Sequence, residues 1–192
     1  VISQIEALAP PKYKCLFYFS LATLLRPGEV VSVRIDWISE EAITIPAEFM
    51  KMKRIHRIPL TPYLISLINE AKTIRKNKRS PFLFPASNKN QHISGQAMAK
   101  WLHEQPEFRN RLVAHGLRSI GRSWFADNDV TFEVAEACLA HLVSISTNRF
   151  FHAEAKSHAE LARLHRDMCP MCSGFKPKAR RIGGSGLKNR HF

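Results

Sequence analysis

The spacing of apolar residues constrains the fold of this chain most, because it follows a helical repeat nearly everywhere and a β-type pattern in one region only. Apolar residues recurring every three or four positions predict helices, and short β-branched runs predict strands. The predicted helices cover residues 3–8, 13–25, 26–33, 61–75, 94–103, 116–127, 132–142 and 153–168, and the predicted strands cover 42–46 and 57–60. We therefore predict a mainly α fold with a small antiparallel β-sheet.

The stretch between the two predicted strands is strongly basic. It contains Lys51, Lys53 and Arg54 within four residues. Two short strands joined by such a stretch predict a small sheet with a cationic turn or edge.

Length and composition favour one folded unit. A chain of 192 residues with 45% hydrophobic content can bury one substantial core but not two. We expect a single domain over residues 1–168 and a basic tail over 169–192, since no acidic residue occurs from 173 onward. The chain opens with Val1, and we expect it to be a fragment whose missing part lies upstream.

The charge of the chain points to a polyanionic partner. Twenty-nine Lys and Arg against sixteen Asp and Glu give a formal net charge of +13. Charge of this size favours nucleic acid. The most apolar stretch, residues 15–25, is too short to span a bilayer and is followed at once by Arg26. We predict no membrane segment.

The four cysteines fall into two kinds. Cys15 and Cys138 lie among apolar residues, and we interpret them as small buried hydrophobes. Cys169 and Cys172 form a C-x-x-C pair that could bind zinc together with His158 and His165. No second C-x-x-C exists, so an untied thiol pair is the favoured interpretation.

Four places carry residues suited to phosphate chemistry. His115 and Arg118 lie three residues apart, so a helix would present both on one face, toward an anionic oxygen. Arg26 follows an apolar helix, where a guanidinium needs a partner, and Glu29 is the simple structural one. Lys51 could act as a general acid or be merely solvated. His141 ends an apolar helix, where a core or capping histidine is the default interpretation.

Taken together and in order, these residues resemble the catalytic domain of a tyrosine recombinase, in particular a phage or genomic-island integrase. The resemblance covers about residues 1–168, with Lys51 eight residues before Pro59 and helices filling the gaps. The motifs are Arg26 in Leu-Leu-Arg-Pro-Gly-Glu, Lys51 in Met-Lys-Met-Lys-Arg-Ile-His-Arg-Ile-Pro-Leu, His115 and Arg118 in His-Gly-Leu-Arg, and His141 in Leu-Ala-His.

This sequence lacks the nucleophilic tyrosine of that family. No tyrosine follows Tyr63, and Phe150 stands nine residues after His141, where the family carries its tyrosine within Tyr-x-His. Phe151 is the second choice of register. Phenylalanine keeps the ring but cannot attack phosphorus. Either the phenylalanine was engineered to block DNA cutting, or the chain is a natural homologue that binds DNA without cutting it. Only one oxygen atom is lost while Arg26, Lys51, His115, Arg118 and His141 are all kept, so we favour engineering.

The resemblance implies a mechanism without metal or cofactor. A tyrosine would attack a DNA phosphate and form a 3′-phosphotyrosine. Arg26 and Arg118 would hold the phosphate oxygens, His115 would help take the tyrosine proton, Lys51 would protonate the leaving 5′-oxygen, and His141 would contact the phosphate.

The partners that this resemblance implies are double-stranded DNA and, for the full-length enzyme, a homotetramer on DNA, in the bacterial cytoplasm on the nucleoid. We expect the fragment alone to be monomeric. The alternative function is a naturally inactive architectural or regulatory DNA-binding homologue. A type IB topoisomerase uses similar residues, but its long coiled linker is missing from this sequence.

Overall fold

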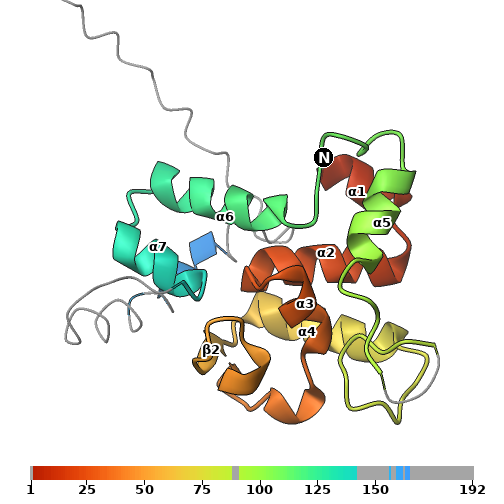
Figure 1. The fold of residues 1–192 in the computed structure, drawn as a ribbon, viewed down its shortest axis with the longest axis horizontal. Coiled ribbons are helices and arrows are strands. Elements are labelled where there is room, and N and C mark those ends of the chain that lie inside the picture. The colour runs from red at the N-terminus through yellow and green to blue at the C-terminus, as the bar shows by residue number, and fades with distance from the viewer. Residues whose placement is uncertain (1, 88–90, 142–155, 157–158, 162, 165–192) are drawn as a thin grey trace, which may run out of the picture.

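The structure is a computed structural model, and it describes residues 2–87, 91–141, 156, 159–161, 163 and 164. Its elements are α1 (Ile2–Leu8), α2 (Pro11–Thr23), α3 (Pro27–Ser32), the short 3-10 helix η1 (Ile35–Trp37), β1 (Ala42–Ile45), the 3-10 helix η2 (Ala47–Phe49), β2 (His56–Pro59), α4 (Pro62–Ile74), α5 (Ala97–Glu104), α6 (Gly116–Asp127) and α7 (Phe132–Cys138). The predicted mainly helical fold with one small antiparallel sheet is confirmed (Figure 1).

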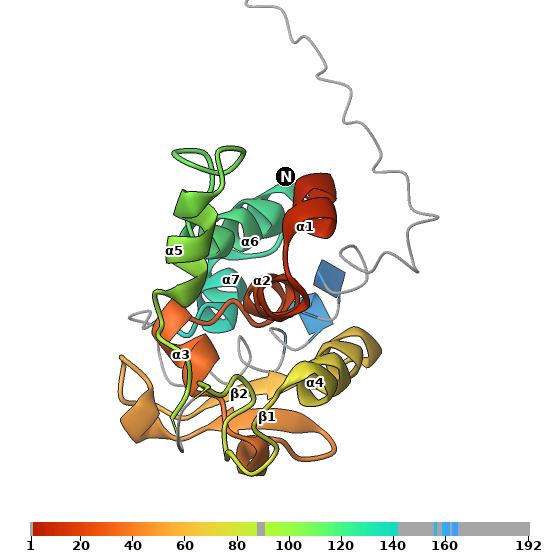
Figure 2. The same ribbon diagram turned by 90° about the vertical axis from the view of Figure 1, so that its right-hand side faces the viewer.

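Helix α2 is the centre of the fold. Every residue from Cys15 to Thr23 is buried, as expected for a helix that is apolar on all sides. The two hydroxyls in this stretch are satisfied within the helix, since Ser20 donates to the carbonyl of Leu16 and Thr23 to that of Phe19, both at 2.7 Å. Helices α3, α4, α5 and α6 all contact α2, which Figure 2 shows end-on among its neighbours.

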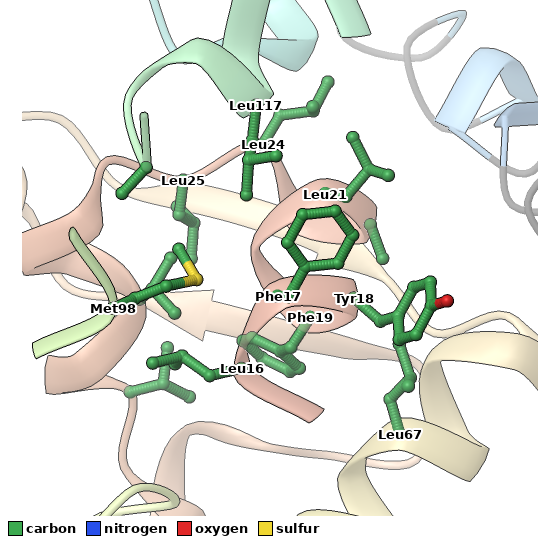
Figure 3. Packing of buried hydrophobic residues seen from close by; sticks show 14 of the residues in the cluster. Leu16, Phe17, Tyr18, Phe19, Leu21, Leu24, Leu25, Leu67, Met98 and Leu117 are labelled. Carbon is green, nitrogen blue, oxygen red and sulfur yellow. The ribbon is translucent and has the colours of Figure 1, made fainter. Parts of the chain in front are cut away.

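The core gathers around the side chains of α2. Phe19 is fully buried and meets Phe84 edge-to-face, with ring centroids 5.4 Å apart. Figure 3 shows Leu67 of α4, Met98 of α5 and Leu117 of α6 converging on the same cluster. Burial of this apolar surface fixes the relative positions of helices that are distant in sequence.

The sheet consists of β1 and β2, paired antiparallel from Ala42 opposite Pro59 to Ile45 opposite His56. Its buried face carries Ile43, Ile45 and Ile58. The first predicted strand was one residue too long at its end, and the second was placed one residue too late in the sequence. The basic stretch lies in the connection between the strands, as predicted.

The helix predicted over 132–142 was wrong at its end, because α7 stops at Cys138. Ala140 has a left-handed backbone with φ 50°, and the amide of His141 donates to the carbonyl of Glu136 at 2.9 Å. This turn closes the helix and places His141 beyond it. Helix α5 likewise begins at Ala97 rather than at 94, because Ser94 forms a turn in which its carbonyl accepts from the amide of Ala97.

The later part of the chain is described in pieces. Residues 156, 159–161, 163 and 164 are helical, within the segment 153–168 that was predicted as the last helix, and Leu161 and Leu164 are buried. The predicted tail over 169–192 lies outside the described residues. Among the described helices, none combines the length and apolar character needed to cross a bilayer.

Candidate active site

Arg26 is positioned by the sharp end of α2. Leu24 adopts a left-handed backbone with φ 52°, which turns the chain, and Arg26 then caps α3 ahead of Pro27. Glu29 accepts the backbone amide of Arg26 at 3.0 Å and its guanidinium at 3.1 Å. The partner predicted on simple structural grounds is therefore present. The Glu29 side chain is only 6% exposed, so the pair is fixed rather than fluctuating in solvent.

The same carboxylate reaches the connection between the strands. Its Oε1 accepts the backbone amide of Lys51 at 3.3 Å. Met50, which precedes Lys51, is buried and anchors this part of the connection, while the Lys51 side chain is exposed. Glu29 thus binds both Arg26, three residues before it, and the backbone of Lys51, 22 residues after it.

Arg118 lies in the first turn of α6 and is buried, with 5% of its surface exposed. Its Nη1 donates to the carbonyl of Leu24. Its Nη2 donates to the carbonyl of Leu139 at 2.6 Å and lies 3.0 Å from Nε2 of His141. One guanidinium therefore joins the end of α2 to the turn that follows α7. Three of its five N–H groups take part in these contacts.

His141 has a second partner on its other ring nitrogen. Its Nδ1 lies 2.5 Å from Oε2 of Glu136, and Oε1 of Glu136 accepts from Nε of Arg122 at 2.7 Å. The side chain of Glu136 is 12% exposed. Arg122 also lies over the ring of Phe132, with 5.2 Å between its guanidinium carbon and the ring centroid.

Arg118, Arg122, Glu136 and His141 line an open cavity of about 290 Å³. Its lining residues are His115, Arg118, Ser119, Arg122, Ser123, Glu136, Leu139 and His141. His115 immediately precedes α6 and is exposed, so it lies at the rim while Arg118 lies at the base. The predicted presentation of both on one side of a helix start is consistent with their lining one cavity.

The cavity is electrostatically prepared for an anion. Burial and, to a smaller extent, the positive charge of Arg26 lower the pKa of Arg118 to about 10, although Glu29 and Glu136 act in the opposite direction. Two guanidiniums that repel each other in a partly desolvated place are stabilised by a shared anionic ligand. A phosphate diester carries the required charge.

The structure brings most of the predicted site residues together. Arg118 and His141 are bonded to each other, and Arg26 and the backbone of Lys51 are both bonded to Glu29. The charges of Arg26 and Glu29 act on Arg118, so these two hydrogen-bonded groups lie close together and form one cluster, while His115 lies at the cavity rim. Phe150 lies outside the described residues. Tyr18 is unsuited to act as a nucleophile, because it is buried and its hydroxyl donates to Glu6 at 2.6 Å.

Two residues of the cluster were missed from sequence. Arg122 follows Arg118 by four positions and so lies on the same face of α6, a signal that was available. Glu136 precedes His141 by five positions, and its approach to the imidazole depends on the left-handed turn at Ala140. Only the backbone geometry reveals that second pairing.

The buried cysteines behave as predicted. Cys15 and Cys138 are thiols with almost no exposed surface, and burial raises the pKa of each to about 12. Among the described residues no group of three His, Cys, Asp or Glu side chains could hold a metal ion. The possible zinc ligands Cys169, Cys172, His158 and His165 lie outside the described residues.

Comparison with known proteins finds similarity over much of the chain. Residues 2–157 match the Phage integrase family. Prophage integrase IntA of Escherichia coli (strain K12) is 32% identical over 142 residues, which is 72% of this chain and 34% of that protein. Prophage integrase IntZ of the same organism is 33% identical over 101 residues, which is 52% of this chain and 24% of IntZ. The chain thus spans about a third of the length of IntA.

Proposed function

Because this chain belongs to the phage integrase family, we propose that it is the catalytic part of a site-specific recombinase that cuts and rejoins DNA through a 3′-phosphotyrosine. We further propose that Phe150 occupies the position of the nucleophile, so that this chain binds DNA without cutting it. The observation that carries the proposal is a pair of neighbouring hydrogen-bonded groups from distant parts of the sequence. Glu29 holds Arg26 and the backbone of Lys51, Arg118 holds His141, and the charges of Arg26 and Glu29 act on Arg118.

The proposed phosphate clamp consists of Arg26 and Arg118. Negative charge builds on the non-bridging oxygens during the transfer, and guanidinium N–H groups held in fixed positions stabilise it without reorganising. Glu29 restrains Arg26, and the carbonyls of Leu24 and Leu139 restrain Arg118. The restraint on both groups is the physical basis for assigning them to one phosphate.

The remaining roles concern protons. A tyrosine has an ordinary pKa near 10, so its attack near neutral pH needs a group that takes its proton. His115, exposed at the cavity rim, is the proposed acceptor. The exposed ammonium of Lys51, on a backbone tied to Glu29, is the proposed donor to the leaving 5′-oxygen, and His141 is the proposed phosphate contact.

The presence of Phe150 at the proposed nucleophile position also supports a second candidate function. If the residue is natural, this chain acts as an architectural or regulatory DNA-binding homologue. The two functions differ in one assay, which uses duplex DNA spanning the chromosomal junctions of the element that encodes the chain. We expect salt-sensitive binding without a covalent product from this chain, and an adduct on a denaturing gel from Phe150→Tyr.

The outcomes of this assay separate the proposals. Absence of an adduct from both Phe150→Tyr and Phe151→Tyr, with binding retained, would favour the architectural function. An adduct from the unchanged chain would contradict the assignment of the nucleophile position.

A further inference from the structure

The cluster contains a carboxylate to which the proposed chemistry gives no role. Glu136 bridges Arg122, at 2.7 Å, and Nδ1 of His141, at 2.5 Å. It is the one carboxylate lining this cavity among the described residues. Its side chain is 12% exposed, so solvent screens its charge far less than that of a surface glutamate.

The two neighbours of His141 determine where its proton lies. A carboxylate only accepts hydrogen bonds, and a guanidinium only donates them. Nδ1 of His141 faces Glu136 and therefore carries the hydrogen, while Nε2 faces Nη2 of Arg118 at 3.0 Å and therefore presents its lone pair. The arrangement admits a single neutral tautomer.

We propose that Glu136, held in place by Arg122, is a positioning residue that fixes His141 in the Nδ1–H form and stabilises its protonated form when a phosphate binds. This inference rests on the proposed function for its second half only. A phosphate oxygen is an acceptor and meets the lone pair of Nε2 unfavourably. Contact between the two requires a proton on Nε2, taken from solvent, which ends the hydrogen bond from Nη2 of Arg118 to Nε2. The freed N–H of Arg118 then donates to the phosphate, and the imidazolium donates to a phosphate oxygen through Nε2–H and to Glu136 through Nδ1–H.

The charges around His141 make Glu136 necessary for this step. Arg118 and Arg122 of α6 face the same cavity, and the charges of Arg26, which caps α3, and of Glu29 within α3 act on Arg118. A proton added to His141 brings a third positive charge beside two guanidiniums. The bound phosphate and Glu136 supply the negative charges that offset it.

The tautomer is testable in the free protein, without DNA. Nitrogen-15 NMR of histidine-labelled protein at about pH 7.5 reports which ring nitrogen of His141 carries hydrogen, and the His141→Gln spectrum assigns the signal. We expect hydrogen on Nδ1 in the unchanged chain and loss of this single form in Glu136→Ala. Glu133→Ala, which removes the same charge one turn earlier in α7, should leave the His141 signals unchanged.

Two results would overturn the inference at this stage. One is hydrogen on Nε2 of His141 in the unchanged chain. The other is an unchanged His141 tautomer in folded Glu136→Ala. If Glu136→Ala fails to fold, the spectrum of the unchanged chain decides the question. That measurement does not depend on whether the chain recombines DNA.

The second half is tested by the pH profile of cleavage in the Phe150→Tyr background. Glu136→Gln keeps the shape of the side chain and removes its charge. We expect cleavage to fall between about tenfold and a hundredfold at about pH 8, because a hydrogen bond to a charged group is lost, and to recover toward about pH 6, where solvent supplies the proton. Glu133→Gln should follow the parent profile.

An equal loss of cleavage at every pH would overturn the proposed stabilisation of protonated His141, because it would mean that Glu136 acts on structure alone. A complete lack of cleavage in the Phe150→Tyr parent would instead contradict the proposed function. The NMR result on the tautomer would then stand by itself.

Discussion

Gly121→Ala should destabilise this protein even though alanine is the better helix former. Gly121 lies in α6 against Leu24, the left-handed residue that ends α2. A Cβ at position 121 would overlap Cδ2 of Leu24 and lie 3.0 Å from its Cδ1. Leu24 has no exposed surface and packs in the core beside Leu117 (Figure 3), so its side chain has little room to move.

The magnitude follows from two opposing effects. Replacing a helical glycine by alanine contributes about 1 kcal/mol of stability. Overpacking a filled core costs about 1 to 3 kcal/mol. We expect a net loss of about 1 kcal/mol. In a Leu24→Ala background, which itself costs about 3 kcal/mol, the clash is gone and Gly121→Ala should stabilise by about 1 kcal/mol. The effect of Gly121→Ala should therefore change sign between the two backgrounds.

The assay is urea unfolding of the four proteins in this double-mutant cycle, followed by circular dichroism. Gly28→Ala is the matched control, because a Cβ at position 28 meets no heavy atom within 4 Å and should not destabilise. We also expect Gly121→Ala to weaken the proposed phosphate clamp, since Arg118 is held by the carbonyl of Leu24. A stabilising Gly121→Ala in the unchanged background, or equal effects in both backgrounds, would refute the packing argument.

Three further predictions concern charged side chains. Arg118→Lys in the Phe150→Tyr background should lower the cleavage rate by about a hundredfold or more while DNA affinity changes far less, because an ammonium cannot reproduce two fixed N–H donors; near-normal cleavage would contradict the clamp. Glu29→Ala should lower the free energy of unfolding in urea by about 3 kcal/mol, because it leaves Arg26 without its partner. A loss below about 1 kcal/mol would contradict a stabilising role of the Glu29–Arg26 ion pair. Glu6 accepts from Tyr18 and Lys14, and these bonds hold its pKa below the ordinary value of 4.5; the stability it contributes is present above that value and lost as pH falls through the folded pKa. The stability difference between the unchanged chain and Glu6→Gln should therefore shrink from about pH 6 to about pH 3, and a constant difference would contradict this.

Local patterns predicted the elements well where apolar spacing and breakers coincide. The bounds of α6 follow from Gly116 and the polar end at Asp127, and the two strands follow from the short β-type runs on either side of the basic connection. The end of α7 could not be predicted, because alanine rarely adopts the left-handed backbone that Ala140 has here. Elements therefore followed from sequence more reliably than their ends.

The residue types of the site were predictable from sequence, but the hydrogen bonds between them were not. The types and order of Arg26, Lys51, Arg118 and His141 carried the family resemblance. The contact of Arg118 with the carbonyl of Leu24 spans 94 residues and depends on the packing of α6 against α2. The pairing of Glu136 with His141 depends on the turn after α7. Both are tertiary facts that no local spacing encodes.

The assignment of position 150 is the centre of this proposal, and peptide mapping of the covalent product tests it most directly. Phe150→Tyr would be reacted with junction DNA, digested with protease and nuclease, and examined by mass spectrometry for the peptide that retains a 3′-phosphonucleotide. We predict that the modified side chain is residue 150, with no modified peptide from the unchanged chain or from Phe151→Tyr. A nucleotide attached to any other residue, or an adduct from Phe151→Tyr alone, would contradict the assignment.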